Sequence, residues 1–460
     1  MMRYENVIVP SRDSAAEWWD IETEDGVICC MQPAQSRCAA PSKLLLPALC
    51  HPHIHLDKAY ILTGNHPPSN AHPGYSDLAP RLGSFSEALA NTSRAKERYT
   101  EDDLYLRGSQ LLATSYTHGV TSLRAFVELD HVTDVLTLTT AIRLKGDFAH
   151  LLEVQICAFA QDPIFSTTHG ESNRAIITSA LRDYGPFIDA LGTTPYVEES
   201  PEASLRNIEW AVTTAIKHDL HLDFHLDYTL TPSSSLEPLA FSVVELLQRH
   251  DWVGTAHESR TIVLGHCTQL SVLDNSQLAR LAEAVITNKL PIHFVGLPTS
   301  DLYMMGRPEK ETSALHQRPR GTLQVPSMIK DLGLSACIGV NNVGNAFTPF
   351  GTGDPLQLAS WGVGIYHAGA IDDAKLLYGC VSWRARAAIG LSLGVDVDGG
   401  EIGEGRCLQG MLLIENKKDI ELPSTTDDPG LKVPARQRIG FEDLVWDPPN
   451  VELRSIVRRA

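Results

Sequence analysis

The strongest constraint on the fold of this chain is a series of eight short apolar segments that alternate with helical patterns. The segments span residues 44–55, 119–128, 151–161, 188–198, 220–228, 261–267, 290–298 and 335–342. Strands separated by helical crossovers form parallel sheets. Eight such units favour a closed (β/α)8 TIM barrel, an α/β fold, over a doubly wound sheet. We therefore predict a barrel domain over residues 44–395.

One crossover illustrates why the intervening stretches are expected to be helices. In SPEASLRNIEWAVTTAIK, Ser200 is a favoured N-cap and Pro201 suits the first helical position. Apolar residues then recur at 208, 211, 212 and 215, which places them on one face of a helix. The segment is predicted to cover the barrel with that face.

The two ends of the chain, residues 1–43 and 396–460, fall outside the barrel count. They contain the β-like pieces NVIVP, GVICCMQ and GMLLIEN. We expect both ends to pair into one composite, sandwich-like β-layer beside the barrel, with the pair Trp18-Trp19 in its core.

Two long connections are expected at the mouth of the barrel. Residues 63–99 follow the first strand and are rich in Pro, Gly, Ser and Asn. Residues 299–325 follow the seventh strand and carry Arg307, Arg318 and Arg320. Connections this long in a compact barrel are typical of lids over a site, so both are interpreted as lids.

Charge narrows the range of partners. The chain has 38 basic and 56 acidic residues, a formal charge of −18, which repels phosphate backbones and anionic membranes. No apolar run is long enough to span a bilayer, and the start of the chain lacks a signal-peptide pattern. We expect a cytoplasmic protein with a small-molecule substrate, no nucleic-acid or membrane partner, and the option of a homo-oligomer.

The stretch CHPHIHLDKAY carries the most specific chemical signal. His53 and His55 lie two residues apart in a predicted strand, so their side chains point to the same face and can converge on one ion. His225 and His266 occur at the ends of the fifth and sixth predicted strands. Because barrel strands end at a common mouth, the four histidines predict a metal site there, the alternative being histidines that simply line strand ends.

The strings HIHLD, DFHLD and LGHCT, together with AFAQDPI, FVGLPTSDLYMMGR and IGVNNVGNAFTPFGTGDPLQLASWGVGI, occur in an order that resembles the amidohydrolase superfamily, and specifically its cytosine deaminase-like members. The resemblance covers roughly residues 40–415, and a fungal branch of deaminase-like proteins carries similar strings. It implies a (β/α)8 barrel flanked by a β-layer from both termini. It also implies one divalent ion, zinc or iron.

The resemblance also implies roles for individual residues. His53, His55 and His225 match metal ligands, and His266 matches the residue that polarises the attacking water. Gln161 matches a glutamine that binds the amide of a pyrimidine.

Two positions depart from the family pattern, and both concern proton transfer. Tyr228 stands where the deaminases carry a glutamate proton shuttle, and Asn341 stands where they carry an aspartate that binds the metal and accepts a proton. An amide has no basic site near neutral pH, and a tyrosine has a reference pKa of about 10. Cytosine deamination is therefore not expected, and a metal would be held weakly. Asp57, Asp227 or Glu128 would compensate only if their carboxylates faced the site.

Three functions remain open at this point. In the first, the metal activates water to hydrolyse a C–N bond of a small cyclic amide or conjugated carbonyl, with His266 and Asp227 or Tyr228 moving protons. In the second, no metal is needed, and the imidazoles and Tyr228 catalyse an isomerisation, cyclisation or C–C bond reaction. In the third, the protein binds a small molecule without catalysis. The string Gly390–Gly394 matches G-x-S-x-G, but its upstream residues look helical, which argues against a serine hydrolase.

Overall fold

The computed structural model describes residues 1–10, 18–34, 42–63, 67–230, 237–307, 319–391, 402–405, 410–426 and 430–457. Its main body is an eight-stranded parallel sheet in the order β12-β11-β10-β9-β8-β7-β6-β5. The strands are β5 (Leu49–His55), β6 (Val120–Glu128), β7 (Glu153–Ala160), β8 (Ala190–Thr193), β9 (His221–Leu226), β10 (Ile262–His266), β11 (Ile292–Gly296) and β12 (Ala336–Ile338).

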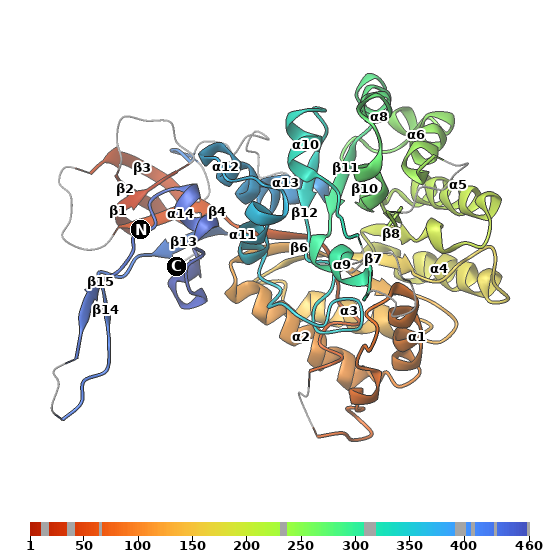
Figure 1. Ribbon diagram of the computed structural model, residues 1–460, viewed down its shortest axis with the longest axis horizontal. Helices are drawn as coiled ribbons and strands as arrows, with labels where there is room; N and C mark the ends of the chain where they lie inside the picture. Colours follow the sequence, from red (N-terminus) through yellow and green to blue (C-terminus); the bar gives the residue numbers. More distant parts are fainter. Residues whose placement is uncertain are drawn as a thin grey trace.

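The sheet closes on itself through the residues that follow β12. Asn341 forms a parallel bridge with Ile54, and the backbone N–H of His55 donates to the carbonyl of Asn341 at 2.9 Å. Each strand lies within one of the eight segments predicted from the sequence. The (β/α)8 barrel is confirmed, and Figure 1 shows it as the larger part of the molecule.

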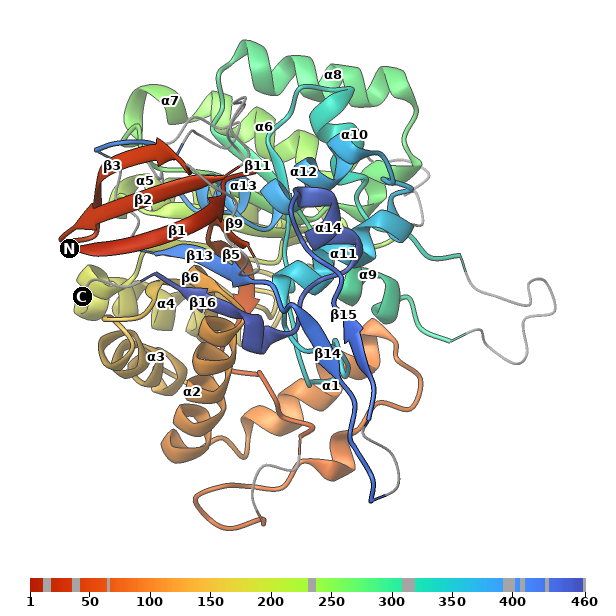
Figure 2. The same cartoon turned by 90° about the vertical axis from the view of Figure 1, so that its left-hand side faces the viewer.

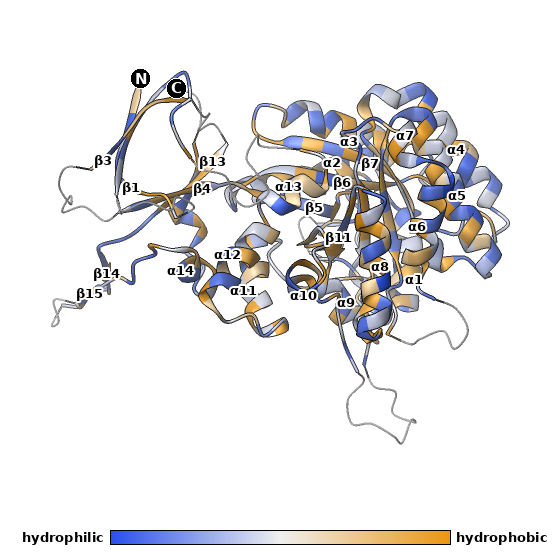
Figure 3. Ribbon diagram, turned by 90° about the horizontal axis from the view of Figure 1, so that it is seen from above, coloured by the Kyte–Doolittle hydropathy of each residue, from blue (hydrophilic) through white to orange (hydrophobic). Residues whose placement is uncertain are grey.

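Helices surround the barrel, with hydrophobic and hydrophilic residues alternating along them (Figure 3). They are α1 (Phe85–Lys96), α2 (Glu101–Thr117), α3 (Leu136–Asp147), α4 (Gly170–Tyr184), α5 (Pro201–His218), α6 (Leu239–Arg249), α7 (Trp252–Thr255), α8 (Asn275–Thr287), α9 (Pro298–Met304), α10 (Val325–Lys330), α11 (Pro355–Ile365), α12 (Ile371–Cys380), α13 (Trp383–Ala388) and α14 (Phe441–Trp446). The helix predicted after residue 200 is α5: the Ser200 side chain accepts from the N–H of Ala203, and the four apolar positions are buried.

Both ends of the chain build a second, six-stranded sheet in the order β16-β13-β4-β1-β2-β3. Its strands are β1 (Met2–Ile8), β2 (Trp19–Glu24), β3 (Val27–Pro33), β4 (Lys43–Pro47), β13 (Met411–Glu415) and β16 (Arg454–Ile456). It lies beside one end of the barrel in Figure 1. The expected sheet from both termini is present, and Trp19 is buried in it.

The boundary between the two sheets differs from the prediction. Residues 44–55 were expected to be one barrel strand, but the structure divides them into β4, which pairs with β1 and β13, and β5, which pairs with β6. Pro47 lacks a backbone N–H and marks the break. The barrel therefore begins at Leu49.

The long connections contain more regular structure than expected. Residues 63–99 include helix α1, whose last residue, Lys96, is buried against the mouth of the barrel. Residues 299–325 begin in α9; Arg307 and Arg320 are exposed, whereas Arg318 lies outside the described residues. The lid interpretation remains a prediction for both.

A two-stranded antiparallel ribbon, β14 (Asp419–Glu421) and β15 (Lys432–Pro434), extends from the six-stranded sheet and projects away from the body in two perpendicular views (Figures 1 and 2). Among the helices of the described residues, none combines the length and apolar character required to cross a bilayer.

Candidate active site

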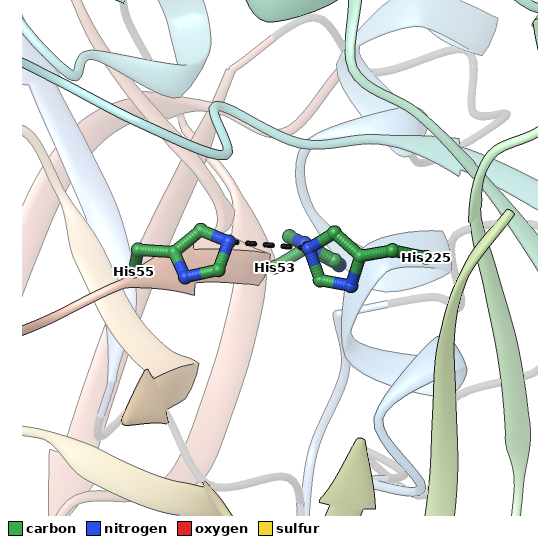
Figure 4. A group of neighbouring side chains, drawn as sticks. All are labelled: His53, His55 and His225. Carbon is green, nitrogen blue, oxygen red and sulfur yellow. Dashed lines mark hydrogen bonds between the residues drawn. The ribbon is translucent and has the colours of Figure 1, made fainter. Parts of the chain in front are cut away.

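Three imidazoles meet inside the mouth of the barrel. The Nε2 atom of His225 lies 3.0 Å from Nε2 of His53 and 3.1 Å from Nε2 of His55. All three side chains are buried, and Figure 4 shows their rings turned toward one another. The sequence placed these residues together, and the structure brings their nitrogen atoms to one point.

The fold positions each ring. His53 and His55 lie two residues apart on β5, and His225 lies on β9, across the barrel. Gly265 on β10 makes room for His53: a Cβ at this position would lie 3.1 Å from Cε1 of the imidazole. The glycine before His266 therefore permits the close approach of β10 to the ring of His53.

A buried carboxylate lies behind the ring of His53. Its Nδ1 lies 3.5 Å from Oδ1 of Asp223, and Oδ2 of Asp223 accepts from Arg124 at 3.1 Å. Asp223 and Arg124 are fully buried. Arg124 also donates from Nε to Gln155 at 3.0 Å. A carboxylate behind a metal-binding imidazole orients the ring and fixes its tautomer, and here the carboxylate is itself fixed by a guanidinium.

The electrostatics of the cluster favour neutral imidazoles. Burial lowers the pKa of His53, although Asp223 opposes the shift. Burial and the neighbouring cationic groups lower the pKa of His55 and His225 well below the usual range. Neutral imidazoles are the form that binds metal ions.

The donor set fits a divalent ion such as zinc. Four nitrogens at zinc distance in a tetrahedron lie about 3.4 Å apart. The separations of 3.0 and 3.1 Å between Nε2 of His225 and those of His53 and His55 are close to this value. Three neutral imidazoles whose Nε2 atoms face one point suit zinc or iron, and leave a position for water. Among the described residues, the group of side chains placed to hold a metal ion consists of these three histidines and includes no carboxylate.

The backbone of Asn341 lies beside the three histidines. Its N–H donates to the carbonyl of His53 at 3.1 Å, and its φ of 66° is the left-handed conformation that asparagine tolerates. Its side-chain Oδ1 is buried and has no hydrogen-bond partner among the described residues. This amide stands at the position where the sequence resemblance implied an aspartate.

His266 is the fourth histidine and has a partner that the sequence analysis missed. Its Nδ1 lies 2.6 Å from Oδ1 of Asp301 on α9, and Oδ2 of Asp301 accepts from the Thr322 hydroxyl at 2.7 Å. The His266 ring centroid lies 5.3 Å from that of His225. If Nδ1 carries the proton toward Asp301, Nε2 is a free base next to the cluster.

The other two proposed proton carriers are engaged elsewhere. The hydroxyl of Tyr228 donates to the carbonyl of Met304 at 2.6 Å, and its ring centroid lies 6.4 Å from that of His266. The Asp227 carboxylate accepts from the N–H groups of Leu239 and Ala240 at 3.0 and 3.1 Å, so it caps helix α6. Asp227 thus has a structural task that the sequence analysis did not anticipate.

A buried network of charges forms the side of the site next to β5. The ammonium of Lys58 contacts Glu128 and lies 3.4 Å from Oε1 of Gln161. Lys96 lies 2.9 Å from Glu128 and 2.5 Å from Asp130. Although burial acts to raise it, the two ammonium groups lower the pKa of Glu128. The Glu128 carboxylate therefore forms ion pairs with Lys58 and Lys96 instead of acting as a general base.

Asp57 belongs to the same region. One of its oxygens accepts from the N–H of Glu128 at 3.2 Å, and the other has no hydrogen-bond partner among the described residues. Burial, followed by the charge of Glu128, raises the pKa of Asp57 to about 6.

Arg124, Asp223 and Asp301 were not singled out from the sequence. The first two are charged residues inside otherwise apolar strands, which is a usable signal because a buried charge requires a partner. Asp223 is also two residues from His225 and so shares its face. Asp301 gave no such signal, since an acidic residue in the first turn of a helix is common.

Comparison with known proteins finds solved structures with a similar fold. No protein-family model matches the chain. The structure is similar to that of 5-methylcytosine deaminase from Klebsiella pneumoniae, with a TM-score of 0.71, 20% identity, and coverage of 90% of this chain and 91% of that one. It is also similar to N-isopropylammelide isopropylaminohydrolase from Burkholderia multivorans, with a TM-score of 0.68, 18% identity, and coverage of 100% and 99%.

One known protein is also similar in sequence. N-isopropylammelide isopropyl amidohydrolase of Pseudomonas sp. strain ADP is 23% identical over 211 residues, which is 45% of this chain and 48% of that protein. The chain therefore aligns with about half the length of this relative. At these identities the likeness establishes a shared barrel fold.

Proposed function

We propose that this protein is a hydrolase that breaks a C–N bond of a small cyclic amide or conjugated carbonyl compound, assisted by one divalent metal ion. The observation that carries the proposal is the convergence of three buried, neutral imidazoles on one point. The names of the structural neighbours, a 5-methylcytosine deaminase and an N-isopropylammelide isopropylaminohydrolase, support a nitrogen-rich ring as substrate.

His53, His55 and His225 would hold the ion, and Asp223 would keep the ring of His53 in place. A divalent ion in such a site supplies a Lewis acid that makes a water molecule more acidic. The chain's own residues must then accept and return the proton and must orient the substrate.

His266 is the proton acceptor in this proposal. Its Nδ1 lies 2.6 Å from Oδ1 of Asp301, and the neutral tautomer that donates from Nδ1 carries a free lone pair on Nε2, on the opposite edge of the ring. This arrangement supplies the base that the amide of Asn341 cannot provide. Asp227 is left out because its carboxylate caps α6.

Gln161 and Tyr228 would position the substrate. The ammonium of Lys58 approaches Oε1 of Gln161, which leaves the amide NH2 group as a donor for a substrate carbonyl. Tyr228 donates to Met304, so its phenol oxygen can accept from a substrate N–H. We therefore assign Tyr228 a binding role instead of the proton-shuttle role of the family's glutamate.

The experiment is a panel of cyclic amides and amino-substituted heterocycles, with ammonia or amine release measured for zinc-loaded and metal-depleted protein. Cytosine should react more slowly than about 1 per second, the lower end of usual enzyme rates. With an active substrate, His266→Ala should lower kcat/KM at least about tenfold, whereas Tyr228→Phe should mainly raise KM. Full activity after metal removal would reject the metal-assisted version in favour of acid–base catalysis by the imidazoles alone.

A further inference from the structure

We propose that Phe85, the first residue of α1, is a specificity-determining residue of the candidate active site. Together with Tyr196, Tyr228 and Phe347 it forms a group of rings that we call the aromatic wall. The aromatic wall limits the substrate to a free planar ring and excludes the same ring carrying a sugar. The inference rests on the proposed function for the position of the substrate ring, next to the three histidines.

The rings of the aromatic wall are in contact with one another. The centroid of the Phe85 ring lies 4.9, 5.7 and 6.0 Å from those of Tyr228, Tyr196 and Phe347. The centroids of Tyr196 and Tyr228 lie 6.1 Å apart. Aromatic rings that contact each other have centroids about 4.5–7 Å apart. Phe85 is therefore the central ring of the aromatic wall, and the other three pack around it.

The aromatic wall lies beside the groups that would bind and convert the substrate. The ring centroid of Tyr228 lies 6.4 Å from that of His266. The ammonium of Lys58, which also approaches Gln161, lies 4.7 Å from the centre of the Phe347 ring. A substrate ring between His266 and Gln161 therefore has the aromatic wall as its neighbour.

The backbone next to Phe85 is joined to the second long connection. Ser84 forms an antiparallel bridge with Met305. Two residues further along that connection, the N–H of Arg307 donates to the carbonyl of Leu82 at 3.1 Å. The two long connections thus fix each other at the point where Phe85 begins its helix.

Two further contacts hold the turn that precedes Phe85. The Glu87 carboxylate accepts from the N–H groups of residues 81, 82 and 83 at 2.8, 2.8 and 2.7 Å. Gly83 has a φ of 68° and permits a close approach, because a Cβ there would lie 3.2 Å from Cζ of Tyr303 on α9. The backbone that carries Phe85 is therefore fixed, and its ring keeps its place in the aromatic wall.

This arrangement separates ligands by shape. A planar ring can pack against the faces and edges of aromatic side chains without displacing them. A sugar is bulky and non-planar, and it needs space that the contacting rings of Phe85 and Tyr228 occupy. Because the backbone is fixed, these rings could admit a sugar only by leaving their packed positions, which is costly in a well-packed cluster. A nucleoside should therefore bind more weakly than its free ring.

The test is equilibrium binding of two matched pairs, uracil with uridine and cytosine with cytidine, to the full chain as purified, measured by calorimetry. Each free ring should bind wild type at least about tenfold more tightly than its nucleoside. Because binding is measured without turnover, its result is independent of the ammonia or amine release that tests the proposed hydrolase.

Substitutions of Phe85 should change the ratio of the two dissociation constants. Phe85→Ala removes the central ring, so the preference for the free ring should fall to about threefold or less. Phe85→Leu also removes the ring but keeps an apolar side chain at the start of α1, so it should give the same result with less risk to folding. Phe187→Ala is the matched control, because Phe187 is exposed and precedes the first residue of β8, at the opposite end of the barrel from the site. It should keep the wild-type ratio.

The ratio separates a specificity role from a structural one, because general damage to the fold weakens both members of a pair alike. Three results would overturn the proposal. The first is a nucleoside that binds wild type as tightly as its free ring. The second is a wild-type ratio in both Phe85 variants. The third is a wild type that binds neither free ring at millimolar concentration.

Discussion

Replacing Asp223 with asparagine should weaken metal binding without removing a ligand. The substitution leaves an amide of similar shape 3.5 Å from Nδ1 of His53, but it removes the negative charge that orients the imidazole and opposes the pKa-lowering effect of burial. It also leaves the buried guanidinium of Arg124 without its carboxylate partner. Metal affinity should therefore fall while His53 itself remains in place.

The magnitude follows from the position of this carboxylate behind the ligand. Removing such an outer partner typically lowers metal affinity by about 10- to 100-fold, or about 1.4–2.7 kcal/mol. Competition with a chromophoric chelator measures the dissociation constant. Gln155→Leu is the matched control, because it removes another buried partner of Arg124 without touching Asp223. Equal affinities of Asp223→Asn, Gln155→Leu and wild type would refute the role of the carboxylate.

Three other substitutions test the surroundings of the site. Lys96→Met leaves Glu128 and its acidic neighbours with one buried cation fewer, so urea denaturation should show a loss of about 3–5 kcal/mol; a loss below about 1 kcal/mol would contradict the network. Burial raises the pKa of Asp227 from 3.8 to about 6, so the folded state binds its proton more tightly than the unfolded chain, and stability should fall by about 2 kcal/mol as pH rises from 4 to 6. Asp227→Asn should flatten that slope, and an unchanged slope would reject the shift. Gly265→Ala places a methyl group against His53 and should lower metal affinity with little change in the thermal transition, whereas wild-type affinity would show that the ring can move freely.

The barrel was predictable because its strands are short, buried and apolar, and because a crossover helix such as α5 carries a clear cap. The division of residues 44–55 was not, since β4 and β5 are both apolar and only Pro47 separates their patterns. The ribbon was not foreseen because its strands are only three residues long and are not part of either large sheet.

Within the site, alternation along a strand was enough to place His53 and His55 on one face, and strand ends brought His225 and His266 nearby. The direction in which a carboxylate points after the end of a strand was not predictable. Asp227 turns toward the N-terminus of α6 and Asp301 turns toward His266, and each depends on how a helix packs on the barrel. That packing is a tertiary property that spacing in the sequence does not encode.

The central claim is that three histidines hold one metal ion that lacks a carboxylate ligand, and elemental analysis after mild chelation tests it most directly. Zinc-reconstituted wild type should contain one ion per chain and lose it to the chelator. Asn341→Asp should retain more of the ion, and His225→Ala should fail to load. A folded wild type that takes up no ion, or one that stays fully loaded under the chelator, would contradict the account.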